Sequence, residues 1–210
     1  MSSRHDLVWL TPAGWAAALA RMPEHGVALS QWRAQNWPAV VRRQEDGAGA
    51  DAVCLGIPLP ERQRVALVAH RDHVARQTPP LTLLDAIGAA PPSWVAGLVA
   101  LQRALAPFDT RVYGSLAMAS ITGLPYLQAA SDIDLLLRPA TRGALQAGLA
   151  LFEQYAQLLP LDGEIMFPSG EAVAWKEWLA ANRNRARVLV KSLGMVRLGA
   201  PAELEASLPA

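Results

Sequence analysis

The sequence contains a single cysteine, Cys54, which excludes an internal disulfide and is typical of a reducing compartment. It also lacks a run of roughly 18 apolar residues, the length that a membrane-spanning helix needs. The first ten residues, MSSRHDLVWL, contain no apolar core of the kind that a secretory signal has. We therefore expect a cytoplasmic protein with no membrane partner.

An excess of charge of one sign is missing as well. The chain has 19 basic and 18 acidic residues among its 210. Nucleic-acid-binding domains usually carry a strongly basic patch, so we expect no nucleic-acid partner. The sequence shows no Walker loop, no dinucleotide-binding fingerprint and no Ser-His-Asp array, which excludes the enzyme classes that depend on these motifs.

One stretch, residues 113–139, joins a turn, a helix and an acidic strand in that order. Gly114 and Ser115 follow the end of an apolar run, and residues 116–121 predict a helix that Ser115 caps and Gly123 ends. Glycine lets a phosphate approach the backbone, and a helix N-terminus offers free N–H groups and a positive dipole to an anion. The turn is therefore a candidate phosphate-binding site.

The residues after this helix predict a buried strand over 132–137 with two acids in an apolar run. Side chains alternate along a strand, so Asp132 and Asp134 are expected on one face and Ile133 and Leu135 on the other. Two carboxylates on a buried strand repel each other unless a cation neutralises them. Mg²⁺ suits such a pair because proteins bind it through one or two carboxylates plus substrate phosphates, and Mn²⁺ is an alternative.

Each part of this stretch has an ordinary structural explanation when it is taken alone. A Gly-Ser before a helix is a common turn and cap, and an Asp-x-Asp at the start of a strand is often a solvated edge. The two parts in this order, with apolar residues behind the acids, favour a site for phosphoryl transfer.

The pattern of Gly-Ser, helix and Asp-x-Asp strand resembles the polymerase-β-type nucleotidyltransferase superfamily. The segment VYGSLAMASITGLPYLQAASDIDLLLRP is more closely similar to the malonate decarboxylase holo-acyl-carrier-protein synthases, also called phosphoribosyl-dephospho-CoA transferases. The segments LDGEIMFPSGEAVAWKEWL and RVLVKSLGMVRL support this resemblance, and HDLVWL and VCLGIPLP extend it into the first half of the chain.

The resemblance implies an enzyme that transfers the prosthetic group of 2′-(5″-triphosphoribosyl)-3′-dephospho-CoA to a serine of the malonate decarboxylase acyl carrier protein and releases pyrophosphate. In this reading Gly114 and Ser115 fix the triphosphate, and Asp132 and Asp134 are the catalytic metal ligands. Citrate lyase uses the same prosthetic group, so its carrier is another possible acceptor. Two other functions stay open: a nucleotidyltransferase that uses an ordinary nucleoside triphosphate on a small molecule or RNA, and a non-catalytic scaffold that binds a carrier protein.

Two further elements provide candidates for the same site. The resemblance implies a third carboxylate from a neighbouring strand, and residues 161–167 predict one that carries Asp162 and Glu164. Glu164 is favoured because it lies deeper in the apolar run, although Gly163 marks a possible bulge that re-aims one of the two, and a solvated hairpin edge is the alternative. Lys191, at the end of a strand over 187–191, is a candidate for neutralising the leaving pyrophosphate.

The order of the remaining elements predicts an α/β or α+β protein in which helices flank a mixed sheet. The resemblance implies a nucleotidyltransferase domain, expected over residues 81–210, preceded by a smaller N-terminal module over residues 1–80, in which strands are expected over 38–42, 52–57 and 64–69. We expect the first module to recognise donor or carrier, with Arg42 and Arg43 as candidate contacts. A helix that begins with Thr141 as its cap is expected over 141–159, and another helix over 171–181.

Overall fold

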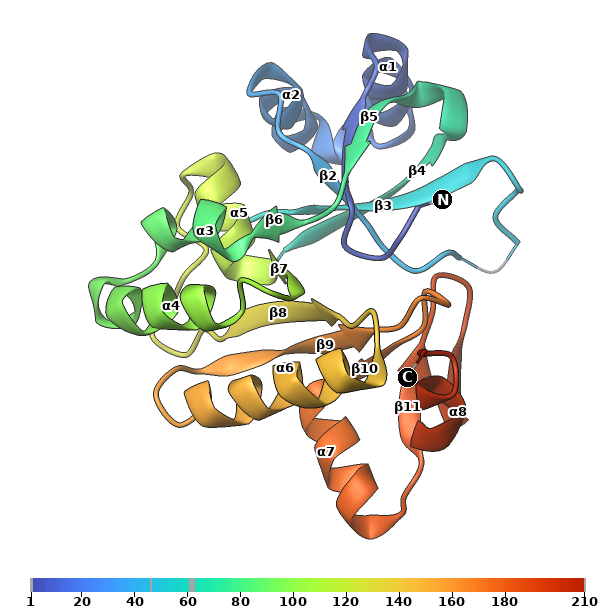
Figure 1. Ribbon diagram of the computed structural model, residues 1–210. Coiled ribbons are helices and arrows are strands. Elements are labelled where there is room, and N and C mark those ends of the chain that lie inside the picture. The colour runs from blue at the N-terminus through green and yellow to red at the C-terminus, as the bar shows by residue number, and fades with distance from the viewer. Residues whose placement is uncertain (1, 46, 61–62, 210) are drawn as a thin grey trace. The chain divides into compact units, whose positions relative to one another are not determined.

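The computed structural model describes residues 2–45, 47–60 and 63–209. The chain divides into two compact units, Met1–Pro80 and Leu81–Ala210 (Figure 1). Both units combine a β-sheet with helices, which confirms the predicted α/β class with a mixed sheet. None of the helices in the described ranges combines the length and the hydrophobicity that a membrane crossing requires.

The first unit is built on a five-stranded antiparallel sheet in the order β4-β3-β2-β1-β5. Its strands and helices are β1 (Leu7–Leu10), α1 (Pro12–Arg21), α2 (Gly26–Ala34), β2 (Ala39–Val41), β3 (Ala52–Pro58), β4 (Arg64–His70) and β5 (Val74–Thr78). The three predicted strands correspond to β2, β3 and β4, whereas β1, β5 and α2 were not predicted. Thr11 begins α1, because its Oγ1 accepts a hydrogen bond from the Gly14 amide at 3.1 Å.

The second unit is built on a seven-stranded mixed sheet in the order β12-β11-β10-β9-β8-β7-β6. The strands are β6 (Leu81–Thr82), β7 (Asp109–Tyr113), β8 (Ile133–Arg138), β9 (Leu161–Met166), β10 (Ala172–Ala174), β11 (Val188–Lys191) and β12 (Val196–Gly199). The helices are α3 (Leu83–Ala86), α4 (Pro92–Ala104), α5 (Gly114–Thr122), α6 (Arg142–Tyr155), α7 (Trp175–Asn184) and α8 (Pro201–Glu205). Strands β8 and β9 are parallel, and every other neighbouring pair is antiparallel.

The parallel pair is joined by α6, which crosses back over the sheet between β8 and β9. Thr141 caps α6 as predicted, since its Oγ1 accepts a hydrogen bond from the Ala144 amide at 3.1 Å. The helix expected over 171–181 is wrong in its first part, because Ala172–Ala174 pairs with β9 as strand β10 and α7 begins at Trp175. Pairing with β9 outweighs the helix preference of the two alanines.

The two faces of the second sheet differ in their residues. On one face, which we call the helix face, α4, α6 and α7 pack against the sheet (Figure 1). The core there includes Ile133, Leu135 and Leu137 of β8 and the aromatic rings of Phe152 and Trp178, which are all buried. Burial of each such side chain stabilises the fold by about 1.5–3 kcal/mol.

The opposite face carries the acidic residues of β8 and β9, and we call it the acidic face. Alternation along β8 places Asp134 there, together with Leu136. Leu136 joins Met166 and Ala172 in a small buried apolar cluster that is separate from the core of the helix face. The acidic face is therefore partly apolar, and its carboxylates lie at one end of β8 and β9.

Candidate active site

The candidate phosphate-binding turn lies where β7 passes directly into α5. Gly114 has a φ of +68°, which residues other than glycine rarely adopt, and the helix begins at this residue. The prediction that Ser115 caps the helix is therefore wrong. Tyr113 is the N-cap residue and makes no side-chain capping bond, and Ser115 lies within the first turn. No hydrogen bond from the N-cap side chain covers the first turn of this nine-residue helix, and a helix N-terminus favours an anion.

The carboxylate of Asp134 lies against Gly114. A Cβ atom added at residue 114 would stand 1.9 Å from Oδ2 of Asp134 and 2.8 Å from its Cγ. Strands β7 and β8 bring the two together, because Tyr113 is the register partner of Asp134. Any side chain at residue 114 is excluded twice, by the backbone conformation and by the carboxylate.

The two predicted acids of β8 differ in their surroundings. The strand begins at Ile133, one residue later than expected, so Asp132 precedes it and is exposed to solvent. Asp134 is half-buried within the strand. Asp134 is therefore fixed by the sheet, whereas Asp132 lies in the segment that leads into it.

Strand β9 places a second carboxylate level with Asp134. In the parallel register Asp162 pairs with Asp134, and Glu164 pairs with Leu136. Gly163 makes this close pairing possible, since it has a φ of +127° and an added Cβ would stand 1.8 Å from the carbonyl oxygen of Leu135. The register runs without interruption, so the possible bulge at Gly163 does not form.

Both acids of β9 form ion pairs with lysine. Nζ of Lys176 lies 3.6 Å from Oδ1 of Asp162, and Nζ of Lys191 lies 2.9 Å from Oε1 of Glu164. The Glu164 side chain is only 6% exposed, whereas the Asp162 side chain is 42% exposed. These are the two lysines of the chain. Lys176 was not predicted as a site residue. The one feature of the sequence that singles it out is the rarity of lysine in this chain.

Lys191 lies at a different level of the sheet from the Gly-Ser turn. It pairs with Ala172, which pairs with Met166, and Met166 is four residues beyond Asp162 on β9. Four residues span about 13 Å along a strand. The structure thus brings together Gly114, Asp134 and Asp162, and separately Glu164 and Lys191, but it does not bring Lys191 to Gly114 and Ser115.

The donor set fits a metal that is shared with a substrate. Among the residues that the structure describes, no three Asp, Glu, His or Cys side chains are grouped closely enough to hold a metal ion. The expected trio, Asp132 and Asp134 with either Glu164 or Asp162, is therefore not gathered. Asp134 and Asp162, side by side on adjacent strands, fit Mg²⁺ bound by two carboxylates and completed by substrate phosphate oxygens.

Two groups away from the row formed by Asp134 and Asp162, which we call the carboxylate row, have shifted pKa values. Burial raises the pKa of Tyr126, which follows α5, to about 12, and a hydrogen bond with Thr122 partly opposes this rise. Hydrogen bonds to Glu171 and then to Glu203 raise the pKa of Arg197, which is a cation at any relevant pH. Neither group changes its charge near neutral pH.

The chain matches two family models that together cover nearly all of it. Residues 3–80 match the phosphoribosyl-dephospho-CoA transferase MdcG N-terminal domain, and residues 82–202 match the C-terminal domain of the same family. No solved structure matches the chain.

Curated relatives carry the same family name. A phosphoribosyl-dephospho-CoA transferase from Xanthomonas campestris pv. campestris (strain 8004) is 39% identical over 198 residues, which is 91% of each chain. One from Bradyrhizobium diazoefficiens is 38% identical over 208 residues, 93% of this chain and 88% of the relative. One from Klebsiella pneumoniae is 36% identical over 188 residues, 85% of this chain and 87% of the relative.

Proposed function

The chain belongs to the phosphoribosyl-dephospho-CoA transferase family, and we propose that it is a nucleotidyltransferase that acts on a protein. Its donor is 2′-(5″-triphosphoribosyl)-3′-dephospho-CoA, and its acceptor is a serine of the malonate decarboxylase acyl carrier protein. We expect this reaction to take place in the cytoplasm, where the single cysteine stays reduced.

The observation that carries this proposal is a row of groups at one level of the acidic face. Tyr113 of β7 pairs with Asp134 of β8, and Asp134 pairs with Asp162 of β9. The N-terminus of α5 begins at Gly114, beside Asp134. An anion site and a pair of carboxylates thus adjoin each other, which is the arrangement that transfer of a phosphate-linked group requires.

The first turn of α5 holds the donor's terminal phosphates. Its backbone N–H groups and the positive end of the helix dipole favour an anion, and the Ser115 hydroxyl can donate a further hydrogen bond. Gly114 leaves room for the phosphate as well as for the Asp134 carboxylate. The donor's terminal phosphates are thereby placed next to the carboxylate row.

Asp134 and Asp162 would hold Mg²⁺, and we assign the third carboxylate of the family pattern to Asp162 in preference to Glu164. Asp162 lies level with Asp134, whereas Glu164 is buried and paired with Lys191. Asp132, at the entry to β8, is the remaining carboxylate near this end of the strand. When bound, Mg²⁺ supplies positive charge that offsets the charge of the phosphates and of the departing pyrophosphate.

The chemical step is a displacement at the α-phosphorus of the donor. The serine oxygen forms a bond to this phosphorus, and the bond from the phosphorus to the bridging oxygen of the pyrophosphate breaks. The serine proton passes to a carboxylate of the row, because residues 81–210 contain neither histidine nor cysteine. The product is a phosphodiester that links the carrier serine to the prosthetic group.

Intact mass spectrometry of the apo carrier protein tests this proposal. After incubation with the enzyme, Mg²⁺ and the donor, the carrier should gain the mass of the donor less pyrophosphate, and a carrier with its serine changed to alanine should gain nothing. Replacing the donor by ATP or GTP should give no product. A wild-type enzyme that leaves the carrier unchanged, or that transfers a nucleotide from ATP, would contradict the proposed reaction.

A further inference from the structure

The acidic face extends well beyond the carboxylate row, across β10, β11 and β12. We propose that this extension, on the Asp162 side of the row, is where the acceptor protein docks. The proposal rests on the proposed function, because it takes the donor's terminal phosphates to be at Gly114 and Ser115. It assigns recognition of the serine-bearing segment to the C-terminal β-hairpin, which is formed by β11 and β12.

The direction of approach follows from the geometry of phosphoryl transfer. The attacking and leaving oxygens lie roughly in line on opposite sides of the phosphorus. The leaving pyrophosphate is at the N-terminus of α5, beside β7, and the carboxylates lie on the next two strands, β8 and β9. The serine must then enter from beyond β9, which is the side of β10, β11 and β12.

Exposed apolar side chains lie on that side. Leu189 of β11 and Leu198 of β12 are register partners and are 39% and 59% exposed. They belong to the acidic face, because Val188 and Val190 point into the core of the helix face and Lys191 reaches Glu164. Val196, the register partner of Lys191, is 41% exposed on the same face. Three apolar side chains thus form one surface, which we call the hairpin patch: Leu189, Val196 and Leu198.

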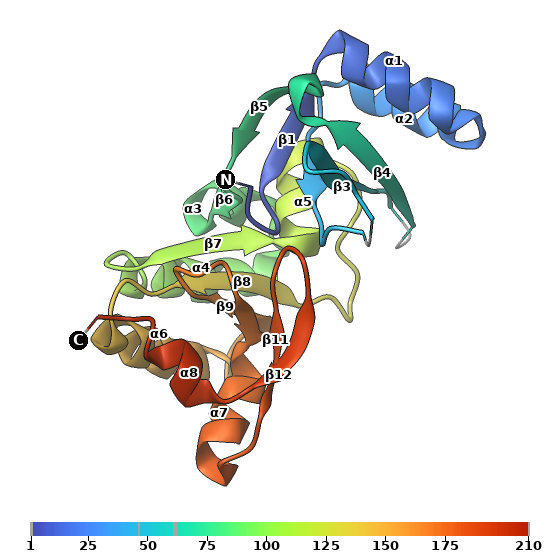
Figure 2. The same cartoon turned by 90° about the vertical axis from the view of Figure 1, so that its right-hand side faces the viewer.

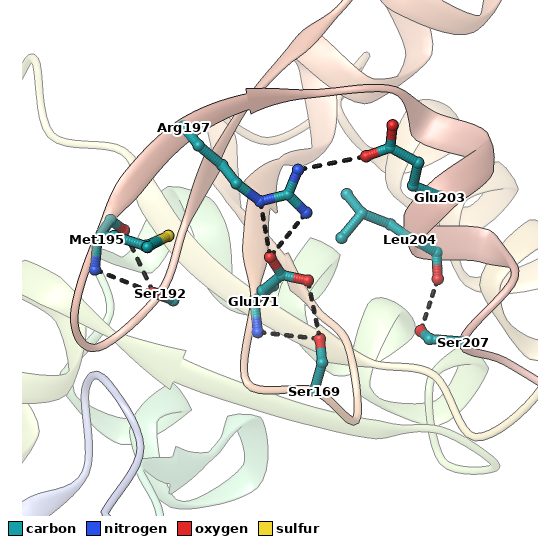
Figure 3. Close-up of polar contacts among 8 residues, drawn as sticks. All are labelled: Ser169, Glu171, Ser192, Met195, Arg197, Glu203, Leu204 and Ser207. Carbon is teal, nitrogen blue, oxygen red and sulfur yellow. Dashed lines mark hydrogen bonds and ion pairs between the residues drawn. The ribbon is translucent and has the colours of Figure 1, made fainter.

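Side-chain contacts on the opposite face of the hairpin hold it in place. Arg197 alternates with Val196 and Leu198, and its guanidinium donates to Oε1 of Glu171 through Nε at 3.0 Å and Nη2 at 2.8 Å (Figure 3). Its Nη1 donates to Glu203 of α8 at 3.2 Å, and Figure 2 shows α8 beside the hairpin. Two N–H groups that converge on one carboxylate oxygen, with a third on Glu203, hold the Arg197 side chain in one orientation. The patch is therefore a preformed surface, which lowers the entropy cost of docking.

The chemistry of the surface specifies the partner. Strands β9 and β11 are separated by one strand, and Leu189 lies at the level of Glu164, so the patch begins about 12 Å from Asp162. Lys176, beside Asp162, is 56% exposed and offers a cation at the near end. The surface fits a segment whose reactive serine is flanked by apolar side chains and by a carboxylate that reaches Lys176. The acceptor of the proposed reaction must present such a segment.

Steady-state kinetics with the apo acyl carrier protein of malonate decarboxylase test this proposal. Leu189→Thr and Leu198→Thr keep a residue that strands favour and remove the apolar side chain. Each should raise the KM for the carrier at least tenfold, equivalent to about 1.4 kcal/mol, while kcat and the KM for the donor stay within about twofold. Leu158→Thr is the matched control, since Leu158 is 74% exposed but lies outside the sheet, after α6, and it should change none of the three constants.

Another molecule that could cover the hairpin patch is a second copy of the chain, paired along the edge strand β12. Light scattering on the same variants tests this alternative by measuring their mass in solution. Variants that keep the wild-type mass in solution and lose carrier affinity support the proposal. A carrier KM that stays within twofold in both variants overturns it, and so does a change in oligomeric state that accounts for the whole effect. These outcomes differ from failure of the proposed function, in which the wild-type enzyme itself transfers nothing.

Discussion

The two units use buried or half-buried carboxylates in opposite ways. In the first unit Asp6 is buried, and its Oδ2 accepts hydrogen bonds from the Gln77 amide group at 2.7 Å and from the Ser3 backbone at 2.9 Å. In the second unit Asp134 and Asp162 stand side by side on adjacent strands. A carboxylate supplied with neutral donors stabilises a fold, whereas neighbouring carboxylates repel each other and hold a cation when one is present.

The distribution of other reactive side chains sharpens this contrast. All four histidines and the one cysteine are in residues 1–80, and both lysines are in residues 81–210. Both lysines form ion pairs with the acids of β9. In the described part of the chain, no histidine belongs to a group that could hold a metal. The chemistry we assign to the second unit therefore depends on carboxylates, lysines and backbone amides.

The largest effect is expected for Asp134→Asn. Transfer should fall at least roughly a thousandfold, equivalent to about 4 kcal/mol of barrier, because the row loses one of its two charges. The free energy of unfolding should hold or rise, since the change relieves repulsion with Asp162 when metal is absent. Rates at saturating Mg²⁺ and thermal melts provide the two measurements. Comparable activity in this variant would remove Asp134 from catalysis, and Asp132→Asn, measured alongside, tells whether the exposed acid matters equally.

The next effect separates the two acids of β9. Asp162→Ala should depress turnover strongly and raise the Mg²⁺ concentration needed for half-maximal rate, with little change in melting temperature. Glu164→Ala should act mainly on stability, by about 1–3 kcal/mol, because Lys191 loses its buried partner. Mg²⁺ titrations of rate and urea unfolding of both variants make the comparison. If Glu164→Ala lost turnover and raised the Mg²⁺ requirement while Asp162→Ala only lost stability, Glu164 would be the third carboxylate of the family pattern.

Much of the second unit could be predicted because its signals are local. The apolar run of β8 with its acid, the glycine after β7 and the Thr141 cap each depend on a few neighbouring residues. The position of Asp162 beside Asp134 does not follow from neighbouring residues in the sequence, because the register of β9 on β8 is fixed by the whole crossover through α6. Sequence alone favoured Glu164 by its depth in the apolar run, and that depth turned out to reflect its pairing with Lys191.

The missed elements have physical reasons too. Strand β5, with the residues VARQT, has no apolar alternation, and its place in the sheet comes from pairing with β1. The helix was expected to begin at Leu116 with Ser115 as its cap, because serine is a common cap, but α5 begins two residues earlier, at a glycine with positive φ. Lys176 follows no motif, and only the fold brings it to Asp162.

A smaller effect, on stability alone, is expected for Asp6→Ala in the first unit. The substitution leaves the Gln77 amide group and the Ser3 N–H without their acceptor, which should lower the free energy of unfolding by about 1–3 kcal/mol. Urea unfolding measures this loss, and kcat at a temperature well below the melting transition should be unchanged. A large loss of kcat in a folded Asp6 variant would break the contrast drawn between the two units.

The smallest effect concerns recognition by the first unit, through Arg42 and Arg43. Arg42 donates through Nε to the Leu55 carbonyl at 3.0 Å and pairs with Glu45, so its guanidinium already serves the fold, whereas Arg43 is exposed. We therefore expect most of the effect of a double change to glutamate to come from Arg43. The apparent KM for donor or carrier should rise a few-fold, equivalent to less than about 1 kcal/mol, with a smaller change in kcat. The increase should shrink as salt is added, because exposed charges are screened.

The single variants Arg42→Glu and Arg43→Glu separate the two contributions, since a loss of stability is expected from the first alone. If neither KM moves at low or high salt, these arginines have no part in recognition, and both substrates are bound by other residues.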